Sequence, residues 1–348
     1  MRTDALDYPL PEELIAQAPV HPRDSSRLLI CSRDSDRLET RTFSDLPDLL
    51  KEGDVLVTNC ARVMPARLFG YKWPTGARIE VFLLERLPDD PTQPNPRFKA
   101  LLRRRRRLGV GDKILFPESR MTATVVESHD EAGADVVELG SVDDVEGEIE
   151  RIGRIPLPPY VKGYTGDLGR YQTIFARISG SVAAPTASLH FTPQVLKRLE
   201  GKGIQRIEGY LRIGWGTFSP IRTENLEDHN LHREYGVLPV ETADRLNAVR
   251  REGGRVVAVG TTMTRLLETS VDGNGVFRPL EGFTAKYITP GYEFKGVDTL
   301  LTNFHLPRTS LLALVAAFYG VEKTLKAYKF AVRQRFRFYS FGDAMLVL

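Results

Sequence analysis

The chain has 348 residues, of which 42% are hydrophobic and 27% charged, and its formal net charge at pH 7 is +3. This is the composition of an ordinary globular protein large enough for two domains, and no apolar run is long enough to cross a bilayer. The first eleven residues lack the apolar stretch of a secretory signal. The two cysteines, Cys31 and Cys60, form neither a metal-ligand spacing nor a disulfide framework. We therefore expect a cytoplasmic protein.

The first half of the chain is predicted to be rich in strands. Residues 54–58 (DVLVT) form one strand, and short alternating strands follow one another between residues 79 and 139, separated by turn-rich segments such as 88–96 (PDDPTQPNP). Short strands at close, regular spacing are typical of a small antiparallel barrel or sandwich. Because this part contains no pattern typical of catalysis, we interpret it as a binding or scaffolding domain.

A run of five consecutive arginines lies within this strand-rich part: Arg103, Arg104, Arg105, Arg106 and Arg107. Without them the net charge of the chain would be negative. Arginine binds phosphate bidentately, and clustered positive charge speeds association with polyanions, so the run is a candidate nucleic-acid contact. The alternative is a solvated turn between two strands, since short basic runs are only weakly specific.

The second half of the chain alternates strands with helices. Thr192 followed by Pro193 predicts a helix start, and glycines at 201 and 203 predict its end. Further strands are predicted at residues 205–213, 255–259 and 298–302, and further helices at 240–252, 264–269 and 310–319. This alternation favours an α/β domain with a mostly parallel sheet, to which residues 54–58 also belong. The predicted organisation is a discontinuous α/β catalytic domain of residues 1–70 and 152–348, with residues 71–151 inserted as a small antiparallel β-barrel domain.

Four polar loops each follow a predicted strand, at residues 59–65 (NCARVMP), 214–218 (GWGTF), 260–262 (GTT) and 303–307 (NFHLP). Ligands of open α/β sheets bind outside the carboxyl ends of the strands, so these loops predict a pocket on one rim. No GxGxxG motif opens a strand–helix unit and no Walker A loop is present in the sequence. An ordinary dinucleotide or P-loop site is therefore not expected.

Four of the six histidines fall in three short polar segments, at residues 185–191 (PTASLHF), 228–235 (DHNLHREY) and 302–307 (TNFHLP). Imidazole titrates near neutral pH and suits proton transfer. Any one of them is equally well explained as a hydrogen-bonded structural residue, but four in one half of the chain favour a site. His229 and His232 are three residues apart, yet no HExxH or cysteine spacing supports a metal, and we predict none.

These segments resemble the S-adenosylmethionine:tRNA ribosyltransferase-isomerase family of queuosine biosynthesis. The resemblance runs nearly end to end, and its longest stretches are residues 180–191 (GSVAAPTASLHF) and 291–312 (GYEFKGVDTLLTNFHLPRTSLL). Shorter matching stretches are residues 7–30, 62–70, 153–161, 170–176 and 341–346. The chain departs from the usual family residues at Cys60, Ala61, Ser188, Met263, Thr264, Thr309 and Ser310. None of these departures removes a histidine or a charged motif residue.

The resemblance implies an enzyme that transfers the ribosyl group of S-adenosylmethionine onto 7-aminomethyl-7-deazaguanine at the wobble position of tRNA. The ribosyl skeleton is rearranged to an epoxycyclopentane, adenine and methionine leave, and the product is epoxyqueuosine-tRNA. S-adenosylmethionine is then a consumed substrate, and no cofactor is expected. The family fold, an α/β domain with an inserted β-barrel, agrees with the predicted elements. We expect the partners to be tRNA and S-adenosylmethionine without a membrane, and the protein to act as a monomer.

This chemistry needs groups that move protons and donate hydrogen bonds. The sulfonium acidifies the neighbouring C5′–H, adenine leaves with help from a donor, and the aminomethyl nucleophile must be neutral. The candidate catalytic residues are His190, His232, Glu234 and His305. The candidate substrate-binding residues are Tyr171, Gln172, Thr173, Thr186, Thr261, Thr262, Arg265, Asn303 and Arg308. The five arginines would hold backbone phosphates of the tRNA.

Without the resemblance, two functions of different classes stand beside each other. One is an α/β transferase or hydrolase that acts on a small polar metabolite. The other is a non-catalytic RNA-binding protein that uses the strand-rich domain and the arginine run. Adenine release from S-adenosylmethionine would exclude the second, and its dependence on tRNA would exclude the first.

Overall fold

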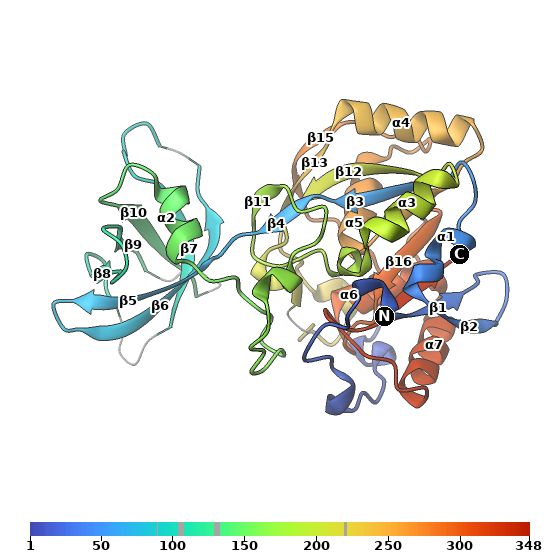
Figure 1. Ribbon diagram of the computed structural model, residues 1–348, viewed down its shortest axis with the longest axis horizontal. Coiled ribbons are helices and arrows are strands. Elements are labelled where there is room, and N and C mark those ends of the chain that lie inside the picture. Colours follow the sequence, from blue (N-terminus) through green and yellow to red (C-terminus); the bar gives the residue numbers. More distant parts are fainter. Residues whose placement is uncertain (89, 104–107, 129–132, 219–220) are drawn as a thin grey trace. The chain divides into compact units, whose positions relative to one another are not determined.

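The computed structural model describes residues 1–88, 90–103, 108–128, 133–218 and 221–348. The chain forms two compact units, which are drawn in Figure 1. Unit 1 consists of Met1–Arg62, Pro158–Ile178 and Ala184–Leu348, and unit 2 consists of Val63–Leu157 and Ser179–Ala183. None of the helices in the described part of the chain has the length and apolar character needed to cross a membrane.

Unit 1 is built on a nine-stranded sheet with the order β15-β13-β12-β3-β14-β16-β17-β1-β2. Its centre consists of four strands that run parallel to one another: β12 (Gln205–Leu211), β3 (Val55–Asn59), β14 (Val256–Val259) and β16 (Thr299–Asn303). These are the four strands that the sequence predicts for the α/β domain. The structure confirms both their positions, to within two residues, and their parallel arrangement.

The outer strands make the sheet mixed, so the prediction of a mostly parallel sheet is wrong. At one end β13 (Glu234–Leu238) pairs antiparallel with β12 and with β15 (Leu280–Thr284). At the other end β17 (Ala344–Val347) is antiparallel to β16, β1 (Arg27–Cys31) is parallel to β17, and β2 (Leu38–Thr42) is antiparallel to β1. The edge strands β2 and β15 are largely exposed, and their sequences therefore lack the apolar runs that mark a buried strand.

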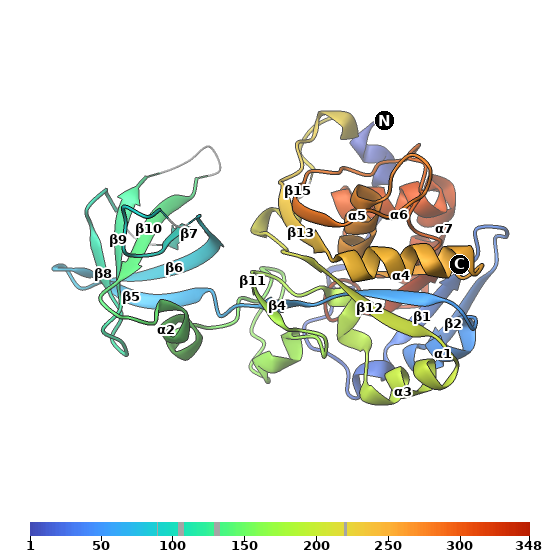
Figure 2. The same ribbon diagram turned by 90° about the horizontal axis from the view of Figure 1, so that it is seen from above.

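Helices cover both faces of this sheet, as Figure 2 shows. One face carries α1 (Leu46–Leu49) and α3 (Pro193–Gly201), and the other carries α4 (Val240–Arg251), α5 (Thr261–Ser270), α6 (Ser310–Tyr319) and α7 (Val321–Arg333). Successive residues of a strand point to opposite faces. In β14, Val256 and Ala258 pack in the core under α4–α7, whereas Val257 and Val259 pack in the core under α1 and α3. Burial on both faces explains why β14 is apolar throughout.

The helix starts follow from local chemistry. The Thr192 hydroxyl accepts a hydrogen bond from the backbone N–H of Val195 at 3.3 Å, which confirms the predicted cap of α3. Helix α5 begins at Thr261, three residues earlier than predicted. Gly260 lies at φ +89°, a conformation that suits glycine and turns the chain sharply from β14 into α5. Thr261 and Thr262 therefore occupy the first helical turn.

Unit 2 is a closed antiparallel barrel of six strands in the order β10-β7-β6-β5-β8-β9, and it confirms the predicted small barrel. Its strands are β5 (Arg67–Trp73), β6 (Ala77–Arg86), β7 (Arg97–Arg103), β8 (Lys113–Leu115), β9 (Thr122–Glu127) and β10 (Asp135–Gly140). Gly70 lets β5 approach β8 closely, because a Cβ atom there would lie 2.6 Å from the Leu115 carbonyl oxygen. Helix α2 (Val145–Ile152) follows the barrel, and the short strands β4 (Ala61–Val63) and β11 (Ile178–Ser181) pair as a separate sheet.

Candidate active site

Three of the central parallel strands end at one pocket of unit 1, which we call the strand-end pocket. The segments that follow β12, β14 and β16 contribute to it, together with the short helix Thr186–His190 and a segment just before β17. Its lining residues are Ala184, Pro185, Thr186, Ala187, Ile213, Gly260, Thr261, Thr262, Thr302, Asn303, Phe304, His305, Leu311, Tyr339 and Ser340. The pocket holds about 40 Å³, which is room for only a few water-sized groups. A nucleoside-sized ligand can therefore place only one part of itself there unless the walls move.

The first turn of α5 supplies donors to this pocket. Thr262 is buried, and its hydroxyl makes no hydrogen bond to any described residue. The first N–H groups of a helix also lack partners within the helix, and the helix dipole makes this end favourable for negative charge. Polar atoms that are buried without a partner are rare in folded proteins, so the Thr262 hydroxyl is available to a ligand.

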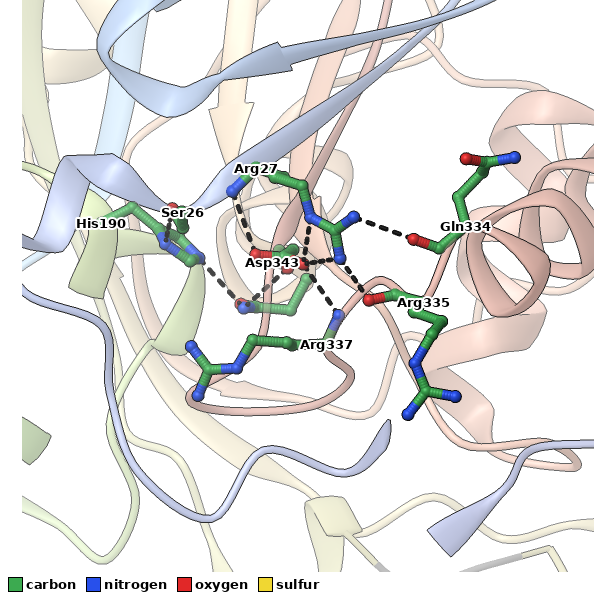
Figure 3. A network of polar contacts seen from close by, with 8 residues as sticks. Ser26, Arg27, His190, Gln334, Arg335, Arg337 and Asp343 are labelled. Atoms are coloured by element: carbon green, nitrogen blue, oxygen red, sulfur yellow. Dashed lines mark hydrogen bonds and ion pairs between the residues drawn. The ribbon is translucent and has the colours of Figure 1, made fainter. Parts of the chain in front are cut away.

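Asn303, at the end of β16, connects the pocket to His190. Its side-chain N–H donates to His190 Nε2 at 3.1 Å, and its side-chain oxygen accepts from the Thr186 hydroxyl at 3.0 Å. Because Nε2 accepts, the ring proton lies on Nδ1 and is donated to Ser26 Oγ at 2.8 Å; Figure 3 shows this pair. The His190 ring also stacks on Phe43, with 5.0 Å between the ring centres.

Both buried histidines are neutral in this structure. Burial, reinforced by the charges of Arg337 and Arg23, lowers the pKa of His190 to about 3. Burial alone lowers the pKa of His305 to about 3. The Nε2 atom of His305 lies 2.9 Å from the Thr302 hydroxyl. Each imidazole is thus a neutral hydrogen-bonding group at physiological pH, and its catalytic role stays a prediction.

Glu234 and Arg265 form an ion pair whose two side chains are no more than 5% exposed. Gly214 donates its N–H to Glu234 Oε1 at 3.2 Å, and Arg265 Nε donates to the Lys286 carbonyl oxygen at 3.1 Å. The Nη2 atom of Arg265 is buried and has no hydrogen-bond partner among the described residues. Arg265 follows Thr262 by three residues on α5, so the two side chains share one side of the helix.

Other predicted residues lie away from the strand-end pocket. His232 and Arg308 are exposed; His232 lies against Gly216, and Arg308 forms an ion pair with Asp7 at 3.0 Å. Asn59, the last residue of β3 and the first of the predicted loop 59–65, is buried and donates to the Leu211 carbonyl oxygen at 2.9 Å, which is a structural role. That loop is absent from the lining of the pocket.

The segment of residues 171–173 packs inside unit 1. Tyr171 is fully buried, and its ring meets the edge of Phe341 with 5.7 Å between centres. The Thr173 hydroxyl accepts from the Phe175 N–H at 3.2 Å, and the Gln172 carbonyl oxygen accepts from a guanidinium group. Of the predicted arginine run, Arg103 is exposed at the end of β7, and Arg104, Arg105, Arg106 and Arg107 lie outside the described residues.

The sequence prediction missed the segment just before β17. Tyr339 and Ser340 line the pocket, and Tyr339 has φ +74°, a strained conformation for a residue other than glycine. Asp343 holds this segment by accepting from the backbone N–H groups of Arg27 at 3.0 Å and Arg337 at 2.8 Å (Figure 3). The adjacent FGDAML motif was the available signal, but nothing in it predicts that the preceding tyrosine reaches the pocket.

No group of three or more histidine, cysteine, aspartate or glutamate side chains in the described ranges is arranged to hold a metal ion. The fold and the pocket define an α/β ligand-binding unit, accompanied by a separate barrel unit. The chain belongs to the queuosine biosynthesis protein family, whose model matches residues 3–347. This confirms the family resemblance seen in the sequence motifs.

Full-length relatives are named as S-adenosylmethionine:tRNA ribosyltransferase-isomerases. The protein from Moorella thermoacetica is 49% identical and that from Symbiobacterium thermophilum 47% identical, and both matches cover 100% of each chain. The crystal structure of an S-adenosylmethionine tRNA ribosyltransferase from Thermotoga maritima is similar with a TM-score of 0.55 and 36% identity. That match covers 99% of this chain and 100% of the other.

Proposed function

We propose that the strand-end pocket is where this chain carries out the reaction of its relatives. The chain is an S-adenosylmethionine-dependent tRNA ribosyltransferase-isomerase. It transfers the ribosyl group of S-adenosylmethionine to 7-aminomethyl-7-deazaguanine in tRNA and isomerises it, which forms epoxyqueuosine and releases adenine and methionine. S-adenosylmethionine and tRNA are both substrates.

The observation that carries the choice of site is the open hydroxyl of Thr262, which lines the strand-end pocket, with the open donor of Arg265 one turn further along α5. The Thr262 hydroxyl and the Arg265 Nη2 are buried and without partners among the described residues. An unpaired buried donor costs about 1–3 kcal/mol, so a ligand that supplies the missing acceptor gains that free energy. In this proposal the two donors, with the N-terminus of α5, receive the carboxylate or the ribose oxygens of S-adenosylmethionine.

The neutral histidines set what acid–base chemistry is available. Above about pH 4 both His190 and His305 are unprotonated, so each is a neutral hydrogen-bonding group, and the burial that lowers its pKa also makes it a weak proton acceptor. His305 lines the strand-end pocket directly, whereas His190 acts on it through Asn303. We assign a hydrogen bond to the reacting substrate to His305 and positioning of Asn303 to His190. Glu234 is assigned to hold Arg265, and the exposed His232 to contact substrate from outside the pocket.

The experiment measures adenine release from S-adenosylmethionine, with and without tRNA that carries the aminomethyl-deazaguanine. Stoichiometric adenine only with that tRNA is the expected result, and absence of adenine under both conditions would contradict the activity. The site is tested with Thr262→Val, which removes the hydroxyl but keeps the side-chain shape. We expect kcat/KM for S-adenosylmethionine to fall about 5–100-fold, the value of one hydrogen bond, while Thr262→Ser keeps most of the activity.

Thr324→Val is the matched control. Thr324 is fully buried on α7, and its hydroxyl also lacks a partner among the described residues, but it does not line the strand-end pocket. Activity of this variant should match that of the unmodified protein. If Thr262→Val were equally active, the pocket assignment would be wrong even though the protein released adenine.

A further inference from the structure

A second cavity of unit 1 lies beside His190. It has a volume of about 20 Å³, is lined by Arg23 and Arg170, and shares Ser340 with the strand-end pocket. The charges of Arg23 and Arg337 both act on the His190 imidazole, and the charge of Arg170 acts on Arg23. Two guanidinium groups, those of Arg23 and Arg170, therefore line the cavity beside His190, and the charge of a third, Arg337, also reaches the imidazole. We call this cavity, with Arg23, Arg170 and Arg337, the arginine pocket.

The three guanidinium groups form no ion pair with a carboxylate in the part of the chain that the structure describes. Arg23 donates to main-chain carbonyl oxygens, the shorter bond being 2.8 Å, and Arg170 donates to one at 2.7 Å. Arg170 also contacts the His21 imidazole at 3.3 Å, and the guanidinium of Arg337 donates to a further main-chain carbonyl oxygen. These bonds fix the side chains but bring no carboxylate of the described residues into direct contact with the three guanidinium groups.

The nearby carboxylates are engaged elsewhere. Asp343 acts electrostatically on Arg337, but its carboxylate forms an ion pair with the Arg27 guanidinium at 3.1 Å. From Arg337 this carboxylate accepts a hydrogen bond of the backbone N–H and none of the guanidinium (Figure 3). Asp167 acts on Arg23, but its carboxylate accepts from the Gly169 N–H at 2.8 Å. Other arginines of unit 1 contrast with this: Arg198, for example, pairs with Asp48 at 2.8 Å.

The arginine pocket is also partly removed from water. Burial lowers the pKa of both Arg23 and Arg337, because it disfavours the charged form. The Nε atom of Arg170 is buried and has no partner among the described residues. Partly buried positive charges without counterions are costly to hold, and an anion with several oxygen acceptors would relieve that cost.

We propose that the arginine pocket binds a phosphodiester group of the tRNA substrate, beside the strand-end pocket that receives the reacting groups. The identification of the anion as part of the tRNA rests on the proposed function. The binding of an anion by this pocket does not depend on it. Guanidinium groups match phosphate oxygens bidentately, so Arg23 and Arg170, which line the cavity, suit one phosphodiester group, and the nearby charge of Arg337 adds to the attraction. The shared residue Ser340 places this phosphate next to the site of transfer.

The carboxylate of S-adenosylmethionine is the other anion in the reaction, and charge argues against it. S-adenosylmethionine carries a sulfonium and an ammonium group besides its carboxylate, so the whole molecule is a cation. Three arginines without a bonded carboxylate among the described residues repel it overall, whereas they attract every phosphate of an RNA loop. The open Thr262 hydroxyl already offers the carboxylate a donor inside the strand-end pocket.

The test uses the full-length protein and the modified tRNA. Arg170→Gln and Arg337→Gln are compared with Arg170→Lys, and Arg198→Gln is the matched control because its charge is already paired. The dissociation constant for tRNA is measured at several salt concentrations, and KM for S-adenosylmethionine is measured at saturating tRNA. We expect each Gln variant to weaken tRNA binding about 5–10-fold and to reduce the salt slope by about 0.7–0.9, the contribution of one phosphate contact.

Arg170→Lys should keep the salt slope, Arg198→Gln should change neither constant, and KM for S-adenosylmethionine should stay within about twofold in all variants. A raised KM for S-adenosylmethionine with an unchanged salt slope would overturn the inference and assign the pocket to the carboxylate. Unchanged binding of both substrates would overturn it in favour of a structural role. Because tRNA binding is measured apart from adenine release, a failure of the proposed activity would be seen separately.

Discussion

The buried pair of Glu234 and Arg265 allows a quantitative prediction about stability. In Glu234→Gln the side chain keeps its size, and its amide oxygen can still accept from the Gly214 N–H. The Arg265 guanidinium loses its counterion while it remains no more than 5% exposed. Breaking a buried pair in this way costs about 3–5 kcal/mol in the free energy of unfolding, because one charge stays buried without compensation.

The two tryptophans of the chain make the assay specific. Trp215 belongs to unit 1 and Trp73 to unit 2, so urea unfolding followed by fluorescence in a Trp73→Phe background reports on unit 1 alone. In this background we expect Glu234→Gln to lower the free energy of unfolding by about 3–5 kcal/mol. Adding Arg265→Met should restore at least half of the loss, since no buried charge then remains.

A loss below about 1 kcal/mol for Glu234→Gln, the range of exposed ion pairs, would refute the view that this pair is desolvated and essential to unit 1. Failure of Arg265→Met to restore stability would show that the loss comes from packing, not from charge. The double variant separates stability from function, because it should be folded and still lack the Arg265 donor proposed for the substrate.

The remaining predictions concern pH, salt and assembly. Because His190 and His305 have pKa values of about 3 when folded and 6.5 as the ordinary value, the unfolded chain binds the additional protons. The two histidines should therefore leave the free energy of unfolding unchanged above pH 6.5, and below pH 6.5 each should lower it by about 1.4 kcal/mol per pH unit. Urea unfolding between pH 7 and 5 should give His305→Gln a shallower dependence of this free energy on pH than the unmodified protein has. An equal dependence would contradict the assignment. Neutralising all five residues of the arginine run should weaken tRNA binding and flatten its salt dependence, and an unchanged slope would assign the run to solvent. Light scattering should give the mass of one chain, and a dimer mass would contradict the expected monomer.

The sequence predicted the centre of unit 1 better than its edges, for a physical reason. The central strands β3, β14 and β16 are buried along their whole length, so their apolar residues reveal them, whereas β12 is buried only at its carboxyl end. The edge strands β2 and β15 are polar and depend on their neighbours for hydrogen bonds, which no local pattern records. Their antiparallel pairing, and hence the mixed sheet, follows from tertiary structure alone.

The candidate site was predicted in part. The loops after β14 and β16 and the short helix Thr186–His190 meet at the strand-end pocket, as expected from the rule that ligands bind at the carboxyl ends of strands. The loop after β3 does not, because the Asn59 side chain turns inward to the backbone of β12. The contribution of Tyr339 depends on a positive φ that no sequence pattern predicts for tyrosine.

Hydrogen bonds distinguish two kinds of polar residue at this rim. The histidines, which are the most conspicuous residues in the sequence, have partners inside the protein: His190 bonds to Ser26 and Asn303, and His305 lies within hydrogen-bond distance of Thr302. By contrast, hydroxyl and guanidinium donors on α5 and in the arginine pocket have no hydrogen-bond partner among the described residues. Buried donors without partners are rare in folded proteins because each costs free energy of unfolding, so those that line a pocket are candidates for ligand binding. Substrate recognition is therefore expected to rest on these donors, with the histidines acting as neutral groups held in place by the fold.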